Sequence, residues 1–139
     1  MPETIREVMT KNPVTLNATE SCVDAARQML DRDIGAVIVL KDGGICGVVT
    51  DRDIVIRVVA EGRNPADTPI GDACSSELIS VQPDDPIKKA VDLMMQHAVR
   101  RLPVVEHDRA VGIVSIGDLA VDRDSDSALG QISAADPNR

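Results

Sequence analysis

Apolar and polar residues follow the same order in the two halves of the chain. Each half has apolar residues three or four positions apart, as in an amphipathic helix, and then two short apolar stretches separated by polar residues, as in a β-hairpin. A short apolar strand precedes the helix, and a second helix follows the hairpin. The first half predicts strands at residues 14–16, 36–40 and 45–49 with helices from Cys22 and Thr50, and the second half predicts strands at residues 79–81, 102–105 and 110–114 with helices from Ile87 and Ser115.

The two halves are copies of one unit. Shifting the sequence by 65 residues, so that Ile5 meets Ile70, aligns residues 5–55 with residues 70–120 without a gap. Unmatched positions mostly keep their apolar character. Seven pairs are identical: Ile5/Ile70, Ala25/Ala90, Met29/Met94, Val39/Val104, Gly47/Gly112, Val49/Val114 and Asp53/Asp118. The fold class is therefore α/β, with two β-α-β-β-α repeats of about fifty residues that share a core because neither copy can cover both faces of its sheet alone.

Segments of distinct composition set the expected boundaries of the two repeats. A segment rich in Gly, Pro and Asn separates the repeats, and a segment rich in Asp, Ser and Ala follows the second. We expect a first repeat at residues 4–61, a linker at 62–69, a second repeat at 70–122 and a weakly ordered tail at 123–139. The methionines of the helices that begin at Cys22 and Ile87, which are Met29, Met94 and Met95, are expected to fill the core.

Composition narrows the class of protein. With 43% hydrophobic and 27% charged residues, the 139-residue chain has the balance of a globular protein. No apolar run approaches the roughly 20 residues that span a bilayer, so we expect no membrane association and a cytoplasmic address. The net charge of -8 and the absence of aromatic residues disfavour nucleic-acid binding. The three cysteines and two histidines lack metal-ligand spacing, so no metal site is predicted.

The most informative segments end the last strand of each repeat. They read Gly47-Val48-Val49-Thr50-Asp51-Arg52-Asp53 and Gly112-Ile113-Val114-Ser115-Ile116-Gly117-Asp118. In both, a hydroxyl residue that can cap a helix is followed three positions later by a carboxylate.

This spacing has two interpretations. In the structural one, the hydroxyl and the carboxylate cap the helix and do nothing more. In the functional one, the hydroxyl and helix terminus meet a phosphate, while the acceptor-only carboxylate takes the hydroxyls of a ribose. An isolated T-x-x-D favours the first interpretation, but its recurrence at matching positions of a repeat strengthens the second. No nucleophile has an adjacent base, so neither interpretation involves catalysis.

The repeat, its size and the pattern G-h-h-[ST]-x-x-D resemble the CBS domain, named for cystathionine beta-synthase. Two such domains in tandem resemble a Bateman module, and residues 99–105, VRRLPVV, match the usual strand entry of the family. The resemblance covers residues 4–122. More narrowly, the chain resembles short stand-alone bacterial CBS-pair proteins, including those of the hypoxic response type.

The resemblance implies a pseudo-twofold pair with two clefts that hold AMP, ADP, ATP, S-adenosylmethionine or a related ligand. Asp53 and Asp118 would then contact ribose, and Thr50 and Ser115 would contact phosphate. The adenine would be bordered by aliphatic residues, because the chain has no aromatic ones. These aliphatic residues are Ile38 and Pro103, with Val14 and Ile79 nearby.

The two copies differ around the candidate site. Arg52 lies between hydroxyl and carboxylate in the first copy, whereas Arg101 lies at the strand entry of the second. Because each cleft borrows from both copies in such a pair, Arg52 and Arg101 would serve different phosphate sites. Each arginine could equally be a solvated surface charge. We therefore expect unequal occupancy of the two clefts.

The leading hypothesis is a non-catalytic regulatory module that senses an adenine nucleotide or adenosyl ligand. It would act as a homodimer on an unknown effector protein. The alternative is a ligand-free structural or interaction protein, induced under stress, in which the turns are only caps. An enzyme is the weakest hypothesis.

Overall fold

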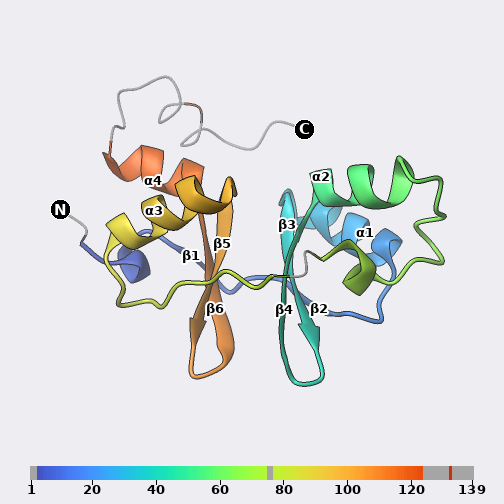
Figure 1. Cartoon of the computed structure of the whole chain (residues 1–139), viewed down its shortest axis with the longest axis horizontal. Coiled ribbons are helices and arrows are strands. Elements are labelled where there is room, and N and C mark those ends of the chain that lie inside the picture. The colour runs from blue at the N-terminus through green and yellow to red at the C-terminus, as the bar shows by residue number, and fades with distance from the viewer. Residues whose placement is uncertain (1–2, 75–76, 124–131, 133–139) are drawn as a thin grey trace. The chain divides into compact units, whose positions relative to one another are not determined.

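The computed structural model describes residues 3–74, 77–123 and 132, and the chain divides into two compact units. The first-repeat unit comprises Val14–Leu78. The second-repeat unit comprises Ile79–Arg139 together with Met1–Pro13. Residues 4–13, which the sequence places at the start of the first repeat, thus pack with the second (Figure 1). The predicted tail lies outside the described residues, except for Arg123 and residue 132.

The first-repeat unit is a three-stranded sheet covered by helices. Strand β3 lies in the centre, parallel to β2 and antiparallel to β4. The unit contains β2 (Thr15–Asn17), α1 (Cys22–Arg32), β3 (Ala36–Lys41), β4 (Gly44–Thr50), α2 (Asp51–Ile54), the π-helical continuation η2 (Val55–Val59) and the 3-10 helix η3 (Ile70–Ala73). Ser21 caps the N-terminus of helix α1, because its Oγ accepts a hydrogen bond from Asp24 N–H at 3.1 Å.

The second-repeat unit also has a three-stranded sheet, but one of its strands comes from the N-terminal segment. Its sheet has the order β1-β6-β5, in which β6 is antiparallel to both neighbours. The unit contains η1 (Ile5–Glu7), β1 (Thr10–Lys11), α3 (Ile87–His97), β5 (Arg101–Glu106), β6 (Arg109–Ser115) and α4 (Ile116–Arg123). In Figure 1, α3 and α4 lie beside β5 and β6, as α1 and α2 lie beside β3 and β4.

Each unit has its own hydrophobic core between sheet and helices. Alternate strand residues, such as Val37 and Val39, point toward the helices, as expected for a strand with one helix-covered face. The first core contains Leu16, Cys22, Ala25, Met29, Val37, Val39, Val49, Ile54, Val58, Ile70 and Ala73, and the second contains Ile5, Val81, Ile87, Ala90, Met94, Leu102, Val104, Val114 and Leu119. The expectation for Met94 is confirmed. The expectation for Met95 is wrong: Met95 is 76% exposed, because it is one position further around α3 than Met94 and lies on the side away from the core.

The strand predicted at residues 79–81 is reduced to a single parallel bridge between Val81 and Val104. In the first repeat, Ala18 N–H extends the matching strand by donating to Leu40 O at 2.7 Å. Pro83 occupies the position of Ala18 in the second repeat and has no N–H to donate. The second copy therefore pairs over a shorter length.

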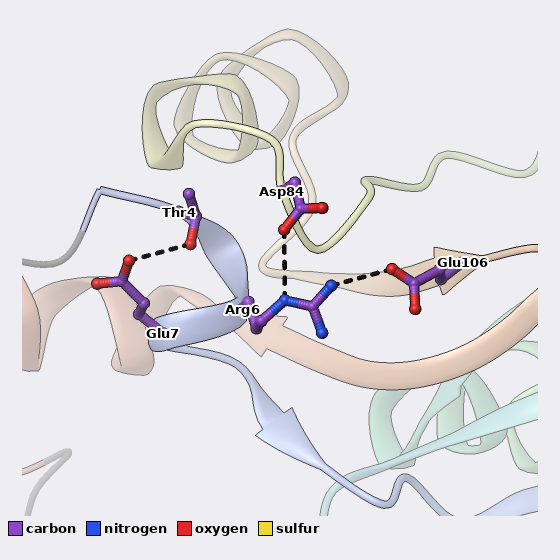
Figure 2. A network of polar contacts seen from close by, with 5 residues as sticks. All are labelled: Thr4, Arg6, Glu7, Asp84 and Glu106. Carbon is purple, nitrogen blue, oxygen red and sulfur yellow. Dashed lines mark hydrogen bonds and ion pairs between the residues drawn. The ribbon is translucent and has the colours of Figure 1, made fainter.

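The N-terminal segment is fastened to the second-repeat unit by an exposed ion-pair network (Figure 2). Arg6 Nε lies 3.3 Å from Asp84 Oδ1, and Arg6 Nη2 lies 3.0 Å from Glu106 Oε2. The two carboxylates raise the pKa of the Arg6 guanidinium. Thr4 Oγ1 donates to Glu7 Oε1 at 3.2 Å in the same helix turn.

Residues 62–69, predicted as a linker, pack within the first-repeat unit. Thr68 is buried, its hydroxyl donates to Asn64 O at 2.8 Å, and its carbonyl accepts from Cys22 N–H at 2.9 Å. Arg63 Nη2 lies 2.7 Å from Asp72 Oδ2. Backbone bonds thus attach this segment to the start of α1.

Candidate functional site

The first candidate turn joins β4 to α2 and is held by Thr50 and Asp53. Thr50 donates to Asp53 Oδ2 through its N–H at 2.8 Å and through its hydroxyl at 3.0 Å. Asp53 N–H donates back to Thr50 Oγ1 at 3.1 Å. These reciprocal bonds form a capping box. They leave Asp53 Oδ1 free of the box.

The second candidate turn joins β6 to α4 in the same way. Ser115 N–H donates to Asp118 Oδ2 at 2.9 Å, and Asp118 N–H donates to Ser115 Oγ at 3.1 Å. The structure thus gives both repeats one geometry, in which a carboxylate is fixed at the end of a strand with its second oxygen outside the box.

The neighbouring strand brings its entry residues to each turn. Asp51 N–H donates to Gly35 O at 3.1 Å, and Ile116 N–H donates to Arg100 O at 2.9 Å. In the second repeat, Arg101 is paired across the sheet with Ser115. The second turn therefore has a cation beside it from its own repeat.

Burial and Arg101 act in opposite directions on Asp118. Burial raises the pKa of the Asp118 carboxyl, because leaving water disfavours the charged form. The hydrogen bonds with Ser115 and the charge of Arg101 lower it, but burial is the larger effect. A ligand that brings hydrogen-bond donors to Asp118 would offset this unfavourable burial of charge.

A second cation lies beside the first turn. Arg52 is exposed, and its backbone N–H donates to the Asp51 carboxylate. Arg57 Nε, in contrast, lies 4.0 Å from Asp53 Oδ1. The sequence interpretation missed Arg57, although the spacing of four residues between Asp53 and Arg57 is that of a helical ion pair.

The two turns differ in the residue that follows the hydroxyl residue, which is Asp51 in the first turn and Ile116 in the second. In the first turn, Asp51 Oδ1 accepts from Arg52 N–H at 2.8 Å. The matching residues of the second turn are Ile116 and Gly117, and an isoleucine side chain cannot accept a bond. The first turn therefore carries an additional negative charge where the second carries none.

The predicted apolar residues lie on two kinds of surface. Ile38 and Pro103 alternate with the core residues of β3 and β5, so they lie on the sheet face opposite the helices, and both are buried. Val14 and Ile79 are half-buried against the helix-side cores. Val14 O accepts from Ile38 N–H at 2.9 Å, which keeps these two residues adjacent.

The polar groups of the two turns are suited to binding a ligand. Each offers a carboxylate oxygen, a hydroxyl and a nearby arginine, beside an aliphatic sheet face. Within residues 3–74 and 77–123, no three His, Cys, Asp or Glu residues lie together as metal ligands. No helix of this part of the chain has the length and apolar character to cross a bilayer.

A tandem pair of α/β repeats, each ending in the same hydroxyl-carboxylate turn, defines a class of regulatory ligand-binding modules. The profile of the CBS domain matches residues 5–60 and 70–122. The chain therefore belongs to the CBS domain family and contains a tandem pair. CBS pairs are in general regulatory and non-catalytic.

Relatives of similar length support this assignment. The CBS domain-containing protein YhcV of Bacillus subtilis is 38% identical over 126 residues, which cover 91% of this chain and 89% of the relative. Hypoxic response protein 1 of Mycobacterium tuberculosis is 34% identical, covering 84% of this chain and 82% of the relative. The resemblance to the hypoxic response type is thus confirmed.

Solved structures agree in fold. The crystal structure of Hypoxic Response Protein I with two coordinated zinc ions matches with a TM-score of 0.76, covering 86% of this chain and 98% of that one. A CBS-domain protein from Burkholderia ambifaria matches with a TM-score of 0.80 at 27% identity, covering 89% and 96% of the two chains.

Proposed function

We propose that this protein is a regulatory module that binds an adenine nucleotide or adenosyl ligand, of the kind of AMP, ADP, ATP or S-adenosylmethionine. It acts in the cytoplasm without catalysis and passes the ligand state to an effector protein. Asp53 and Asp118 contact ribose, while Thr50, Ser115, Arg52 and Arg101 contact phosphate.

The observation that carries this proposal is the repeated placement of the aspartates. In both turns one carboxylate oxygen is fixed by the N–H of the hydroxyl residue, at 2.8 Å for Asp53 and 2.9 Å for Asp118. The other oxygen stays outside the capping box, where it can accept from a ribose hydroxyl. A carboxylate held in advance loses little side-chain freedom on binding, which favours affinity.

The second-repeat turn is proposed to bind phosphate more tightly than the first. Arg101 approaches Asp118 closely enough to lower its pKa, and no carboxylate stands at the position of Asp51. In the first turn, the Asp51 carboxylate would repel a phosphate at short range. Arg57 lies on the Asp53 side of that turn and supports ribose contacts instead.

The active form is proposed to be a homodimer. Leu30 and Met95 occupy matching positions on α1 and α3, and each is 76% exposed. Beside Met95, the second-repeat unit has an apolar groove of about 510 Å³ lined by Val91, Met94, Met95, Ala98, Val99, Arg100, Ile116, Leu119 and Ala120. Exposed apolar side chains gathered beside a groove support an interaction site here.

The closed capping boxes favour one other function. The N–H and hydroxyl of Thr50 and the N–H and Oδ2 of Asp53 already bond to each other, so the capping box forms without a ligand. A ligand-free interaction protein, induced under stress, would need no more than this.

Absorbance separates the two functions. The chain has no Trp or Tyr, so a purified sample with a clear 260 nm band contains co-purified nucleotide. Sites left empty by purification are titrated with AMP, ATP and S-adenosylmethionine while the melting temperature is followed. A ligand at 100 times its Kd stabilises by about 2.7 kcal/mol. No shift with any of the three would favour the interaction protein.

Asn variants show whether the assigned turns hold the ligand. Asp118→Asn keeps one amide oxygen for the Ser115 N–H but replaces the other acceptor by an NH2 donor. The variant should fold and lose binding at this turn, whereas Asp53→Asn should affect the other. A pair of variants with undiminished ligand shifts would overturn the assignment.

A further inference from the structure

Two cysteines lie together in the first-repeat unit, outside the contacts proposed for the ligand. Cys46 is on β4, and Cys74 follows η3 directly. Both side chains pack against the first core, and Cys46 is close enough to raise the pKa of the Cys74 thiol. A β-carbon on Gly47, the neighbour of Cys46, would lie 3.9 Å from Cys74 Sγ, so the Cys74 thiol lies beside the part of β4 that carries Cys46.

We propose that Cys46 and Cys74 form a reversible intramolecular disulfide when the protein meets a low-molecular-weight disulfide oxidant. The bond would join β4 to the end of η3. This inference is independent of the ligand-binding proposal.

The third cysteine shows why the site is selective. Cys22 begins α1 and is fully buried in the first core, where its thiol faces the carbonyl of Pro69. Cys46 and Cys74 are only half-buried, so a small reagent can reach them. Reaction of a thiol with a disulfide depends on such access.

The surroundings of Cys74 make its thiol a weak acid. Burial raises the pKa of Cys74 to about 12, with further increases from the hydrogen bond with Cys46 and from the charges of Cys46 and Asp53. Arg57 opposes this increase. Since the thiolate is the nucleophile, Cys74 is slow to attack a reagent from solution, and Cys46 reacts first.

The exchange proceeds in two balanced steps. The Cys46 thiolate attacks the reagent RSSR, whose S–S bond breaks, giving a mixed disulfide Cys46–SR and one RS⁻ that takes a proton. Cys74 then loses its proton to solvent and attacks Cys46 Sγ, releasing the second RS⁻. The two cysteines are oxidised by two electrons, and the reagent is reduced to two thiols.

Peptide mapping tests the bond directly. The three cysteines fall in separate tryptic peptides, residues 12–27, 42–52 and 64–88. The full-length protein is equilibrated with excess oxidised glutathione, alkylated and digested without reduction. We expect peptide 42–52 to be joined to peptide 64–88, with Cys22 alkylated. Dithiothreitol should restore all three thiols.

Single variants test the order of reaction. Cys74→Ser should stop at the mixed disulfide on Cys46. Cys46→Ser keeps the burial of Cys74, so we expect its glutathione adduct to form at least ~10 times more slowly than that on Cys46. Cys22→Ala should leave the bond unchanged. Circular dichroism confirms that each variant is folded.

The proposal is overturned if the folded protein gives no joined peptide while protein unfolded in urea does. It is also overturned if Cys22 appears in the bond as often as Cys74, or if the joined peptides come only from disulfide-linked dimers.

Discussion

Met9 lies so close over Gly112 that a β-carbon on Gly112 would be 2.7 Å from Met9 Sδ and 2.8 Å from Thr10 O. Strand β1 can therefore pair with β6 only because residue 112 is glycine. We expect Gly112→Ala to displace β1 and lower the free energy of unfolding by roughly 1–3 kcal/mol, as overpacking does. Urea unfolding followed by circular dichroism measures this loss.

Gly47 is the matching residue of the first repeat and provides the control. A β-carbon there would meet only Cys74 Sγ, at 3.9 Å, an ordinary contact. Gly47→Ala should change stability by less than about 1 kcal/mol. Equal losses in the two variants would contradict the explanation through β1.

Ala98 ends α3 in the left-handed conformation, with φ of 53°. Such a conformation strains a residue with a β-carbon but not glycine. Ala98→Gly should therefore raise the free energy of unfolding by about 0.5–1 kcal/mol, net of the entropy that glycine adds to the unfolded chain. Calorimetry at matched concentration measures it. Ala26→Gly, in an exposed position inside α1, should instead lower stability.

Asp118 should make stability depend on acid pH in an unusual direction. Burial raises its pKa in the folded state, so between the ordinary value of 3.8 and the raised value the folded protein holds more protons than the unfolded chain. Its contribution to stability therefore falls as pH rises through this window. We expect Asp118→Asn to gain stability relative to the parent protein as pH rises through it, measured by urea unfolding at each pH.

Arg101 provides the check on this prediction. Its charge lowers the pKa of Asp118, so Arg101→Gln should raise that pKa further and widen the pH window. NMR titration of the Asp118 carboxyl shows the shift. A pKa that falls in Arg101→Gln would contradict the assigned cause.

Met95 should be part of the surface through which two copies associate. Met95→Glu places a charge on the exposed apolar surface of α3 and should raise the dimer dissociation constant at least ~10-fold, as measured by analytical ultracentrifugation. Gln96→Glu adds the same charge about 100° around the helix and should have a smaller effect. A parent protein that is monomeric at high concentration would contradict the homodimer.

The local pattern was enough to predict most elements and the geometry of both turns. The helices beginning at Cys22 and Ile87 and both hairpins are present, because their periodicity matches what each unit buries. The Thr50/Asp53 and Ser115/Asp118 boxes follow from spacing alone, since each bond joins residues three apart.

Contacts between distant residues could not be predicted in this way. Nothing near residue 10 indicates that β1 pairs with residues 112–113, because that pairing depends on a glycine more than a hundred positions away. The meeting of Cys46 with Cys74, and of Arg6 with Glu106, has the same origin. The exposure of Met95 also depends on which side of α3 the sheet covers.

The sequence by itself determined the repeat, the CBS family and the capping turns, because these depend on residue order over a few positions. Only the tertiary structure decided which segments lie beside those turns: Arg57 and the cysteine pair near Asp53, and Arg101 near Asp118. Burial and charge act through space, so the acidity of Cys74 and Asp118 is set by neighbours that the order of residues does not reveal.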